Sequence, residues 1–353
     1  MKNYDGIALF SGGLDSILAA RLLMEQGRSI KCLHFYSPFF GHPGRVEHWQ
    51  ELYGLDITPV DASEAFVNML RNGPEHGFGS AMNPCVDCKI LMMRLAREQM
   101  NAYGASFLVS GEVLGQRPMS QRRDTLNVIR RDADVRDILV RPLSARLLDP
   151  TAAEESGLID RSRLLSLNGR GRKEQLAMAE RFGITEIPTP GGGCKLTEKE
   201  NTRRFWPVLS RLAAPDVNDF LLADVGRQFW FEDRWLTIGR HKFDNEAYAG
   251  LIRDNDLRFK IAGFPGPIAV GRSSRPWDGE AVREAAALVA SYSPRACKAS
   301  EEGQRISVRV TANGQTDMVE IIPNRETAFH EPTWERARDE LHALRKPGKH
   351  GGD

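Results

Sequence analysis

Short apolar segments alternate with amphipathic segments along the first 205 residues of the chain. The apolar segments, each typical of a buried parallel strand, are residues 6–10, 30–35 and 107–111. The amphipathic segments, in which apolar residues recur every three or four positions as on a helix face, are residues 17–27, 90–104 and 173–183. This alternation predicts an α/β domain over residues 1–205, with a doubly wound parallel sheet covered by helices on both faces.

The pattern changes after residue 205, where strand-like alternation becomes dominant. The elements expected in this part are a hairpin at 227–240, a strand behind a turn at 265–271, a helix at 278–293 and a second hairpin at 305–322. They predict a smaller α+β domain over residues 206–325. The polar end of residues 326–353 predicts a partly disordered tail.

A glycine turn with Asp and Ser joins the first predicted strand to the first predicted helix. Gly12 and Gly13 allow the backbone to curl, so that several N–H groups and the helix N-terminus converge on one anion. The spacing differs from a Walker A loop, and no lysine follows the glycines. Pyrophosphate is therefore the expected ligand of this loop. The alternative is an ordinary glycine turn in which Asp15 and Ser16 cap the helix.

Composition narrows the classes of protein to consider. No apolar run in the 353 residues is long enough to span a bilayer, and five cysteines, an odd number, argue for a reducing cytoplasm. Because 48 basic residues nearly balance 47 acidic ones, any nucleic-acid surface must be local. Basic residues cluster at 115–131 and 168–173, either as a binding stripe or as a solvated surface.

Three cysteines form a candidate chemical centre. Cys85 and Cys88 open a predicted helix, and Cys194 follows three glycines at 191–193, which permit a close backbone approach. Three thiolates suit an iron–sulfur cluster with one open iron, such as [4Fe–4S], and they equally suit a persulfide relay. Zinc completed by another ligand, or simple buried thiols, is the remaining interpretation. The two cysteines expected to be packing residues are Cys32 and Cys297.

The Ser-Gly-Gly-x-Asp-Ser loop resembles the PP-loop of ATP pyrophosphatases, which cleave ATP between the α and β phosphates and adenylate a substrate. Residues 111–121, together with 85–96, look like the tRNA 4-thiouridine synthase branch of that superfamily. The Asn-Pro-Cys-Val-Asp-Cys segment is also similar to bacterial 2-thiouridine synthases, whose catalytic cysteine maps to Cys88. No part of residues 1–353 is expected to correspond to the N-terminal RNA-binding domain or the rhodanese domain of the 4-thiouridine synthases.

The resemblance implies an ATP site built from several segments. Asp15 is expected to position Mg²⁺, and the strand end at His34 and Phe35 to receive adenine. The other residues implied in ATP binding are Ser11, Gly12, Gly13, Ser16, Gly111, Glu112, Gln116 and Lys173. The sulfur would come from a persulfide on Cys88 or Cys194, or from a cluster held by Cys85, Cys88 and Cys194.

Residues 236–272 resemble the RNA-binding domain of the NFACT proteins, in which a Gly-Arg segment, an Asn and a later Pro-Gly recur. The matching positions are Gly239, Arg240, Asn245, Glu246, Pro265 and Gly266. The resemblance implies RNA contacts from Arg240, His241, Lys242, Asn245 and Arg258. Trp230 and Trp235 could stack on bases, but hairpin aromatics usually face inward, which favours a core position.

The function that these features predict is an ATP-dependent sulfurtransferase that adenylates a uridine-type carbonyl in tRNA and replaces its oxygen with sulfur, releasing AMP and pyrophosphate. The alternatives are a PP-loop synthetase that uses ammonia and a non-catalytic, nucleotide-sensing adaptor that binds RNA or ribosomes. Expected partners are tRNA, Mg²⁺ and a sulfur donor such as a cysteine desulfurase or free sulfide. The sequence leaves open the modified nucleotide and the oligomeric state, a homodimer included.

Overall fold

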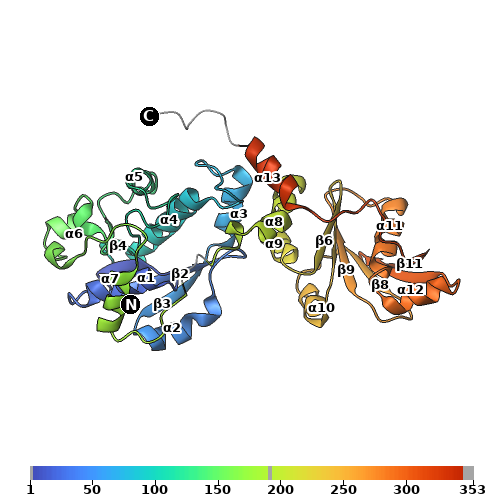
Figure 1. The fold of residues 1–353 in the computed structure, drawn as a ribbon, viewed down its shortest axis with the longest axis horizontal. Coiled ribbons are helices and arrows are strands. Elements are labelled where there is room, and N and C mark those ends of the chain that lie inside the picture. Colours follow the sequence, from blue (N-terminus) through green and yellow to red (C-terminus); the bar gives the residue numbers. More distant parts are fainter. Residues whose placement is uncertain (1–2, 190–192, 345–353) are drawn as a thin grey trace. The chain divides into compact units, whose positions relative to one another are not determined.

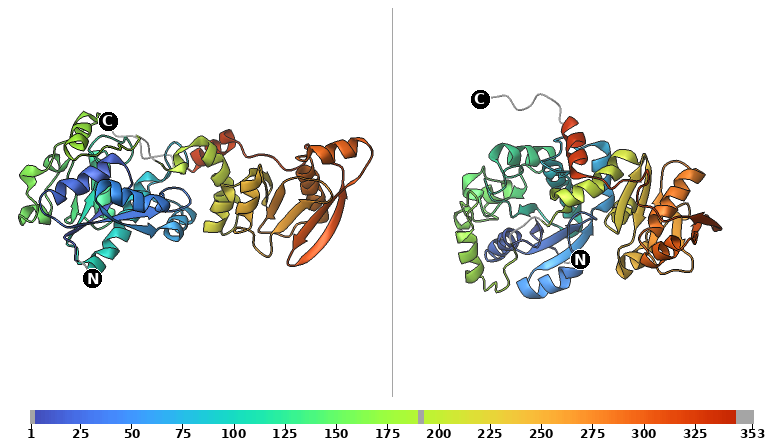
Figure 2. Two further views of the ribbon diagram at one scale, coloured as in Figure 1. Left: turned by 90° about the horizontal axis from the view of Figure 1, so that it is seen from below. Right: turned by 45° about the vertical axis from the view of Figure 1, so that its right-hand side comes forward.

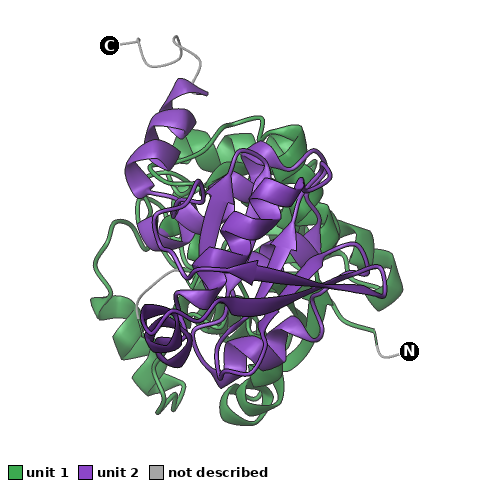
Figure 3. Cartoon of the chain, turned by 90° about the vertical axis from the view of Figure 1, so that its right-hand side faces the viewer, with its two compact units in different colours: residues 1–197 green, residues 198–353 purple. Residues whose placement is uncertain are grey.

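The computed structural model describes residues 3–189 and 193–344 and divides the chain into two compact units, Met1–Thr197 and Glu198–Asp353 (Figure 3). The predicted domain boundary at residue 205 falls inside helix α8 (Lys199–Arg211), the first helix of the second unit. Within the described ranges, no helix combines the length and the apolar character needed to cross a membrane.

Unit 1 is built around a five-stranded parallel sheet with strand order β3-β2-β1-β4-β5 (Figure 1). The strands are β1 (Gly6–Leu9), β2 (Ile30–Tyr36), β3 (Asp56–Asp61), β4 (Phe107–Ser110) and β5 (Leu139–Val140). The helices are α1 (Leu14–Met24), α2 (Val46–Tyr53), α3 (Ser63–Asn72), α4 (Cys85–Tyr103), α5 (Arg123–Asp132), α6 (Ala152–Glu155) and α7 (Lys173–Arg181). The predicted fold class of this part is confirmed.

Apolar side chains fill both faces of this sheet. Ala8, Cys32 and Val109 face the core that α1, α2 and α7 complete. Ile7 and Leu33 point to the opposite face and pack with α4 and α5. Because both faces are covered, the strands are apolar throughout, as the sequence pattern predicts.

The strand order places the glycine loop at a switch point of the sheet. The chain leaves β1 toward β2 on one side, and β4 pairs with β1 on the other side. In open parallel sheets a crevice forms outside the carboxyl ends of the strands at this point. The segments that follow β1, β2 and β4 therefore lie around one location.

Unit 2 contains a six-stranded antiparallel sheet with strand order β11-β10-β8-β9-β7-β6. The strands are β6 (Arg227–Phe231), β7 (Arg234–Ile238), β8 (Leu257–Ile261), β9 (Ile268–Arg272), β10 (Ile306–Ala312) and β11 (Gln315–Ile321). Both predicted hairpins are present, and β10–β11, orange to red in Figure 2, turns at Asn313 and Gly314, which have positive φ angles of 50° and 74°.

Helices cover parts of both faces of this second sheet. Beside α8, the helices are α9 (Val217–Ala223), α10 (Lys242–Tyr248), α11 (Gly279–Ala290), α12 (Pro294–Glu301) and α13 (Trp334–Ala343). Helices α11 and α12 pack on β8, β10 and β11 around a core that includes Phe259 and Val308. Helix α13, inside the predicted tail, packs on α8, and Trp206 donates a hydrogen bond to Glu340 at 2.7 Å. The unit is thus the predicted α+β domain.

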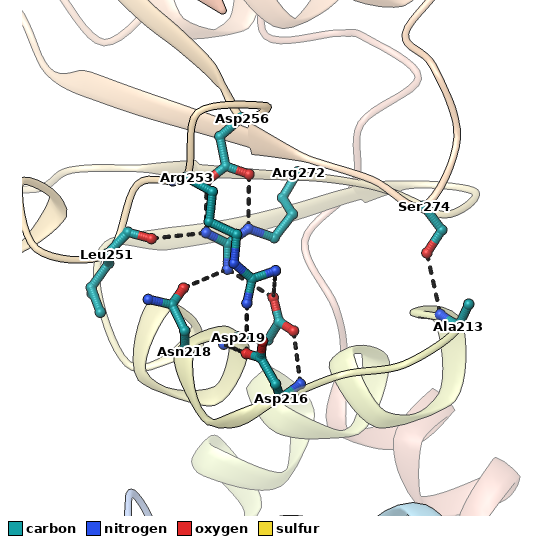
Figure 4. A network of polar contacts seen from close by, with 9 residues as sticks. All are labelled: Ala213, Asp216, Asn218, Asp219, Leu251, Arg253, Asp256, Arg272 and Ser274. Atoms are coloured by element: carbon teal, nitrogen blue, oxygen red, sulfur yellow. Dashed lines mark hydrogen bonds and ion pairs between the residues drawn. The ribbon is translucent and has the colours of Figure 1, made fainter. Parts of the chain in front are cut away.

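A buried polar network anchors α9 to the sheet of unit 2 (Figure 4). Arg272 on β9 bonds Asp256 at 2.6 and 2.9 Å and Asp219 at 2.7 Å. Arg253 bonds Asp216 at 2.6 Å, and its guanidinium also lies 3.3 Å from Asp219. Burial lowers the pKa of Arg272, but the two carboxylates outweigh this and raise it. These charges are paired within the fold and serve its structure.

Candidate functional site

The loop between β1 and α1 adopts a conformation that requires its glycine. Gly12 has a φ of +76°, and a Cβ there would lie 2.8 Å from the Trp49 ring. Ser16 Oγ donates to the Gly13 carbonyl at 2.7 Å, and the Ser11 N–H donates to Ser16 Oγ at 3.3 Å. The N-cap residue of α1 is Gly13, and no side chain caps this helix. The loop is therefore not an ordinary capped turn, and its backbone can receive an anion.

Asp15 is the second residue of α1 and follows the glycine loop directly. Gln116 donates from Nε2 to Asp15 Oδ2 at 3.0 Å, whereas Asp15 Oδ1 is buried without a hydrogen-bond partner among the described residues. Burial raises the pKa of Asp15, although Gln116 and the guanidinium groups of Arg172 and Arg117 oppose the rise. A buried carboxylate beside this glycine loop has the chemistry that Mg²⁺ prefers, so Asp15 fits the expected metal.

The segment after β4 contacts the glycine loop directly. A Cβ on Gly111 would lie 2.6 Å from the backbone of Asp15, so only glycine permits this approach. Further along, the Gly169 N–H donates to the Leu114 carbonyl at 2.7 Å. This bond brings residues 168–173 beside residues 111–116, and Lys173 is exposed at the start of α7. Segments that are far apart in the chain therefore share one site.

Glu112 interacts with two cationic side chains. Its carboxylate accepts from Arg141 Nε at 2.9 Å and lies 3.9 Å from Lys89 Nζ. Burial alone would raise the pKa of Glu112, but Arg141 and Lys89 lower it overall. Because Lys89 follows Cys88 on α4, this buried carboxylate connects the cysteine helix to the segment after β4.

His34 has both ring nitrogens engaged. Nδ1 lies 3.0 Å from the Phe10 carbonyl, and Nε2 accepts from the His42 N–H at 2.8 Å. Burial lowers the pKa of His34, so the ring is neutral and donates from Nδ1. Phe35 is buried in the sheet core. Neither side chain is open to adenine, so any contact from this strand end comes from its backbone.

The cysteines of the C-x-x-C pair have different surroundings. Cys85 is the first residue of α4, and Asn83 Nδ2 lies 3.1 Å from its sulfur as a donor. Burial raises the pKa of the Cys88 thiol well above its usual range, and electrostatic contact with Cys194 and Cys85 adds to this. The structure thus brings Cys194 within electrostatic range of Cys88.

The segment that carries Cys194 is held beside the loop that follows β2. The Lys195 N–H donates to the Phe39 carbonyl at 2.8 Å, just after β2. Gly193 has a φ of +40°, while Gly191 and Gly192 lie outside the described residues. No disulfide joins the five cysteines, all of which lie in the described ranges. Cys32 is buried in the sheet core, as predicted for a packing residue, and Cys297 is half-buried beside the end of α11.

The three cysteines form no ready metal site in this arrangement. Across residues 3–189 and 193–344, no group of three His, Cys, Asp or Glu side chains is placed to hold a metal ion. Burial raises the pKa of the Cys88 thiol, and Asn83 donates to the sulfur of Cys85. A [4Fe–4S] site on Cys85, Cys88 and Cys194 stays a prediction.

In unit 2, several predicted RNA-binding residues have local roles. Arg240 bonds Asp244 at 3.1 Å, and Lys242 lies 3.5 Å from Glu246. The Asn245 amide oxygen accepts from the Ile268 N–H at 3.2 Å, joining α10 to β9. Gly239, whose Cβ would lie 2.3 Å from that amide, and Gly266, whose Cβ would lie 2.5 Å from Ile261, permit close packing.

The remaining candidates differ in exposure. His241 is the N-cap of α10 and is exposed, and Arg258 on β8 is exposed. Trp230 and Trp235 stack on each other with ring centroids 5.3 Å apart, and both are buried, so the core interpretation is confirmed.

The unit 1 site also contains residues that the sequence analysis did not name as site residues. They are Asn83, Lys89, Arg117, Arg141, Arg172 and Gln175. Lys89 and Arg117 lie inside the motifs quoted above, so proximity to a motif was an available clue. Arg141 and Gln175 become part of the site only through strand β5 and helix α7, which no local pattern places there.

The chain matches known proteins over part of its length. Residues 2–146 match the family model described as thiamine biosynthesis protein (ThiI). A "Probable tRNA sulfurtransferase" of Thermococcus kodakarensis is 30% identical over 138 residues, covering 36% of this chain and 34% of that protein. The "Probable tRNA sulfurtransferase" of Methanosarcina acetivorans is 32% identical over 115 residues, 31% of this chain and 28% of that protein.

Two solved structures show weaker likeness. A predicted subunit of a tRNA methyltransferase from Methanocaldococcus jannaschii has a TM-score of 0.30 and 16% identity, covering 39% of this chain and 69% of that one. The C-terminal part of a fibronectin/fibrinogen-binding protein from Streptococcus suis has a TM-score of 0.25 and 11% identity, and the match covers 44% of this chain and 70% of that one. The chain spans about a third of the length of the curated relatives it matches. Residues 2–146 thus resemble the ThiI family, and this part of the chain is similar to tRNA sulfurtransferases.

Proposed function

We propose that the protein is an ATP-dependent tRNA sulfurtransferase that adenylates a uridine-type carbonyl and replaces its oxygen with sulfur. The observation that carries the proposal is the meeting of three segments in unit 1: the glycine loop, the segment after β4 and the cysteine helix. Gly111 touches the backbone of Asp15, and Glu112 lies 3.9 Å from Lys89, the neighbour of Cys88. Similarity to tRNA sulfurtransferases over the same residues supports it.

The first half of the reaction uses the crevice at the switch point. A carbonyl oxygen is a poor leaving group, so the base must first be activated as its adenylate. The backbone of Ser11, Gly12 and Gly13 would hold the pyrophosphate part of ATP, with Ser16 shaping the loop. Asp15 would hold Mg²⁺, which supplies charge neutralisation when bound. Gln116 orients the Asp15 carboxylate, and Lys173 lies on the adjoining segment.

The second half of the reaction uses the cysteines as a relay. In this proposal the outer sulfur of a Cys88 persulfide bonds to the activated ring carbon, and the C–O bond to AMP breaks. Cys194 then bonds to the Cys88 sulfur, the S–S bond to the base breaks, and the thiolated base leaves a Cys88–Cys194 disulfide. A cysteine desulfurase would renew the Cys88 persulfide by transferring sulfane sulfur to the Cys88 thiol after an external dithiol has reduced this disulfide. Free sulfide would renew it directly, because attack of hydrosulfide on the Cys88 sulfur breaks the Cys88–Cys194 bond and leaves a Cys88 persulfide and a Cys194 thiol. Electrostatic contact between Cys88 and Cys194 supports these two roles, with Cys85 beside them at the start of α4.

In this proposal, unit 2 is an RNA-recognition module of NFACT type, which the sequence predicts at residues 206–325. The proposed partners are tRNA and a sulfur donor, either a cysteine desulfurase or free sulfide, in the cytoplasm. Five cysteines without a disulfide are consistent with a reducing compartment.

The test combines two measurements on the whole chain. Purified protein with ATP, Mg²⁺ and unmodified tRNA should release AMP and pyrophosphate, and adding sulfide should give a thiolated uridine detected by nucleoside mass spectrometry. AMP release with ammonia incorporation instead of sulfur would identify an amide-forming synthetase. Nucleotide binding without AMP release would identify a non-catalytic adaptor, and either result would overturn the proposal.

A further inference from the structure

One face of the unit 2 sheet is open over three of its strands. Side chains alternate along β8 and β10, so that Phe259, Ile261, Val308 and Val310 point into the core beneath α11 and α12. The alternate residues point to the other face. The outward residues of β8, β10 and β11 are Arg258, Lys260, Ser307, Arg309, Thr311, Thr316, Met318 and Glu320.

Three cations gather on this open face. Arg258, Lys260 and Arg309 are all exposed, and within residues 3–189 and 193–344 none of them forms an ion pair or a side-chain hydrogen bond. The one acidic side chain among the outward residues of these strands is Glu320, which accepts a hydrogen bond from the Ser307 hydroxyl. The surface therefore carries a net positive charge that the fold does not neutralise.

The register makes this arrangement costly for the sheet itself. Lys260 lies directly opposite Arg309 in the antiparallel pair of β8 and β10. Like charges directly opposite each other destabilise a sheet, because their Cβ atoms lie only about 5 Å apart. Arg258, two residues before Lys260 on β8, lies opposite Thr311. A fold under selection for stability alone would place a threonine or an opposite charge at one of these positions.

We propose that this open sheet face, defined by Arg258, Lys260 and Arg309, docks the phosphate backbone of the RNA substrate. The inference rests on the proposed function, which supplies the RNA. Arg258 and Lys260 are two residues apart on one strand, about 7 Å, a separation that suits successive phosphates of a nucleic-acid strand.

Neighbouring groups on the same face fit a polyanion. The hydroxyls of Thr311 and Thr316 lie 3.1 Å apart and can each donate to a phosphate oxygen. Lys260 also pairs across the sheet with Ile268, whose N–H donates to Asn245 on α10. That helix belongs to the segment that resembles the NFACT proteins. Among the outward residues of β11, Met318 is the exposed apolar side chain. One apolar side chain is too small an apolar area to favour binding to a lipid surface.

The decisive experiment compares two triple variants of the whole chain in tRNA binding, measured by fluorescence anisotropy between 50 and 200 mM KCl. The test variant carries Arg258→Gln, Lys260→Gln and Arg309→Gln. The control carries Arg283→Gln, Arg295→Gln and Lys298→Gln, which remove the same charge from α11 and α12, the helices that cover the opposite face.

We expect the test variant to bind tRNA about 100-fold more weakly near 0.1 M salt, with a log–log salt slope smaller by about 2 to 3, because three phosphate contacts are lost. The control should stay within about threefold of the unaltered chain. Equal affinity of both variants would overturn the docking surface while leaving the sulfurtransferase proposal intact. An unaltered chain that binds no tRNA would overturn the proposed function, and the surface with it.

Two further readouts separate RNA docking from a role of the cations in the fold and from binding of acidic protein segments. Lys260→Gln should leave the thermal unfolding midpoint unchanged or raise it at low salt, because it removes a like-charge pair. A fall of more than about 4 °C would show that the cation serves the fold, which overturns the inference. If the test triple lost binding to polyglutamate but kept binding to tRNA, the face would be a site for acidic protein segments instead.

Discussion

Replacing Glu112 by glutamine should destabilise unit 1 by about 3–5 kcal/mol, the usual cost of removing one partner from a buried ion pair. The Glu112 carboxylate and the Arg141 guanidinium are 2.9 Å apart, and their side chains are 2% and 4% exposed. At that distance, and an effective dielectric constant of about 20, their attraction is about 6 kcal/mol before desolvation is counted. Glutamine keeps the shape of the side chain but leaves Arg141 buried without a counter-charge.

Hydrogen exchange with mass spectrometry in increasing urea measures this effect within unit 1. Peptides that cover β1, β4 and α4 report the free energy of opening of the sheet around the site. Asp124→Asn is the control, since it breaks an ion pair with Arg122 whose side chains are 67% and 66% exposed, and it should change stability by less than about 1 kcal/mol.

The pH dependence gives a second signature. Because Arg141 and Lys89 lower the pKa of Glu112 in the folded chain, the carboxylate stabilises the fold fully above its ordinary pKa. That contribution is lost as the pH falls through the lowered folded-state value, so the Glu112→Gln variant and the unaltered chain should converge in acid. If Glu112→Gln changed the free energy of unfolding at neutral pH by less than about 1 kcal/mol, no more than the Asp124→Asn control, the reasoning would be refuted.

Three further outcomes follow from the site. Asp15→Asn should reduce pyrophosphate release at least about a hundredfold without lowering the unfolding midpoint, since burial already disfavours the charge; unchanged release would remove Asp15 from the ATP site. Gly12→Ala should lower the free energy of unfolding, measured in urea, by at least about 1–2 kcal/mol, because φ there is +76° and a Cβ would collide with the Trp49 ring. Gly44→Ala is the control, since a Cβ at Gly44 meets no other atom. Equal stability of the two variants would contradict this geometry. At about pH 8, iodoacetamide should modify native Cys88 at least about tenfold more slowly than in the urea-unfolded chain, because burial raises its pKa; equal rates would argue against a protonated resting thiol.

Local sequence patterns determined the elements and the position of the glycine loop. The apolar runs at β1, β2 and β4 and the periodic helices that follow them specify backbone conformation and burial within a few residues. The same holds for the Asn313-Gly314 turn, whose positive φ angles are intrinsic to those residue types. These features depend on neighbours in the chain, so one sequence was enough to predict them.

The tertiary structure alone decided which distant groups meet. Cys194 comes within electrostatic range of Cys88, as the grouping of the three cysteines predicted. The bond from the adjacent Lys195 to the backbone at Phe39 after β2 does not follow from spacing. Arg141 becomes the partner of Glu112 because β5 pairs with β4. The ring of His34, a residue of the strand end expected near adenine, is tied to the Phe10 carbonyl.

The open sheet face of unit 2 shows the same division. The sequence places Arg258 and Lys260 on one side of a strand, because successive side chains point to opposite faces. Only the strand order sets Arg309 opposite Lys260, and only the packing of α11 and α12 decides which face stays uncovered. Local conformation is encoded by a few adjacent residues, whereas contacts across the sheet depend on the register and the packing of the whole unit.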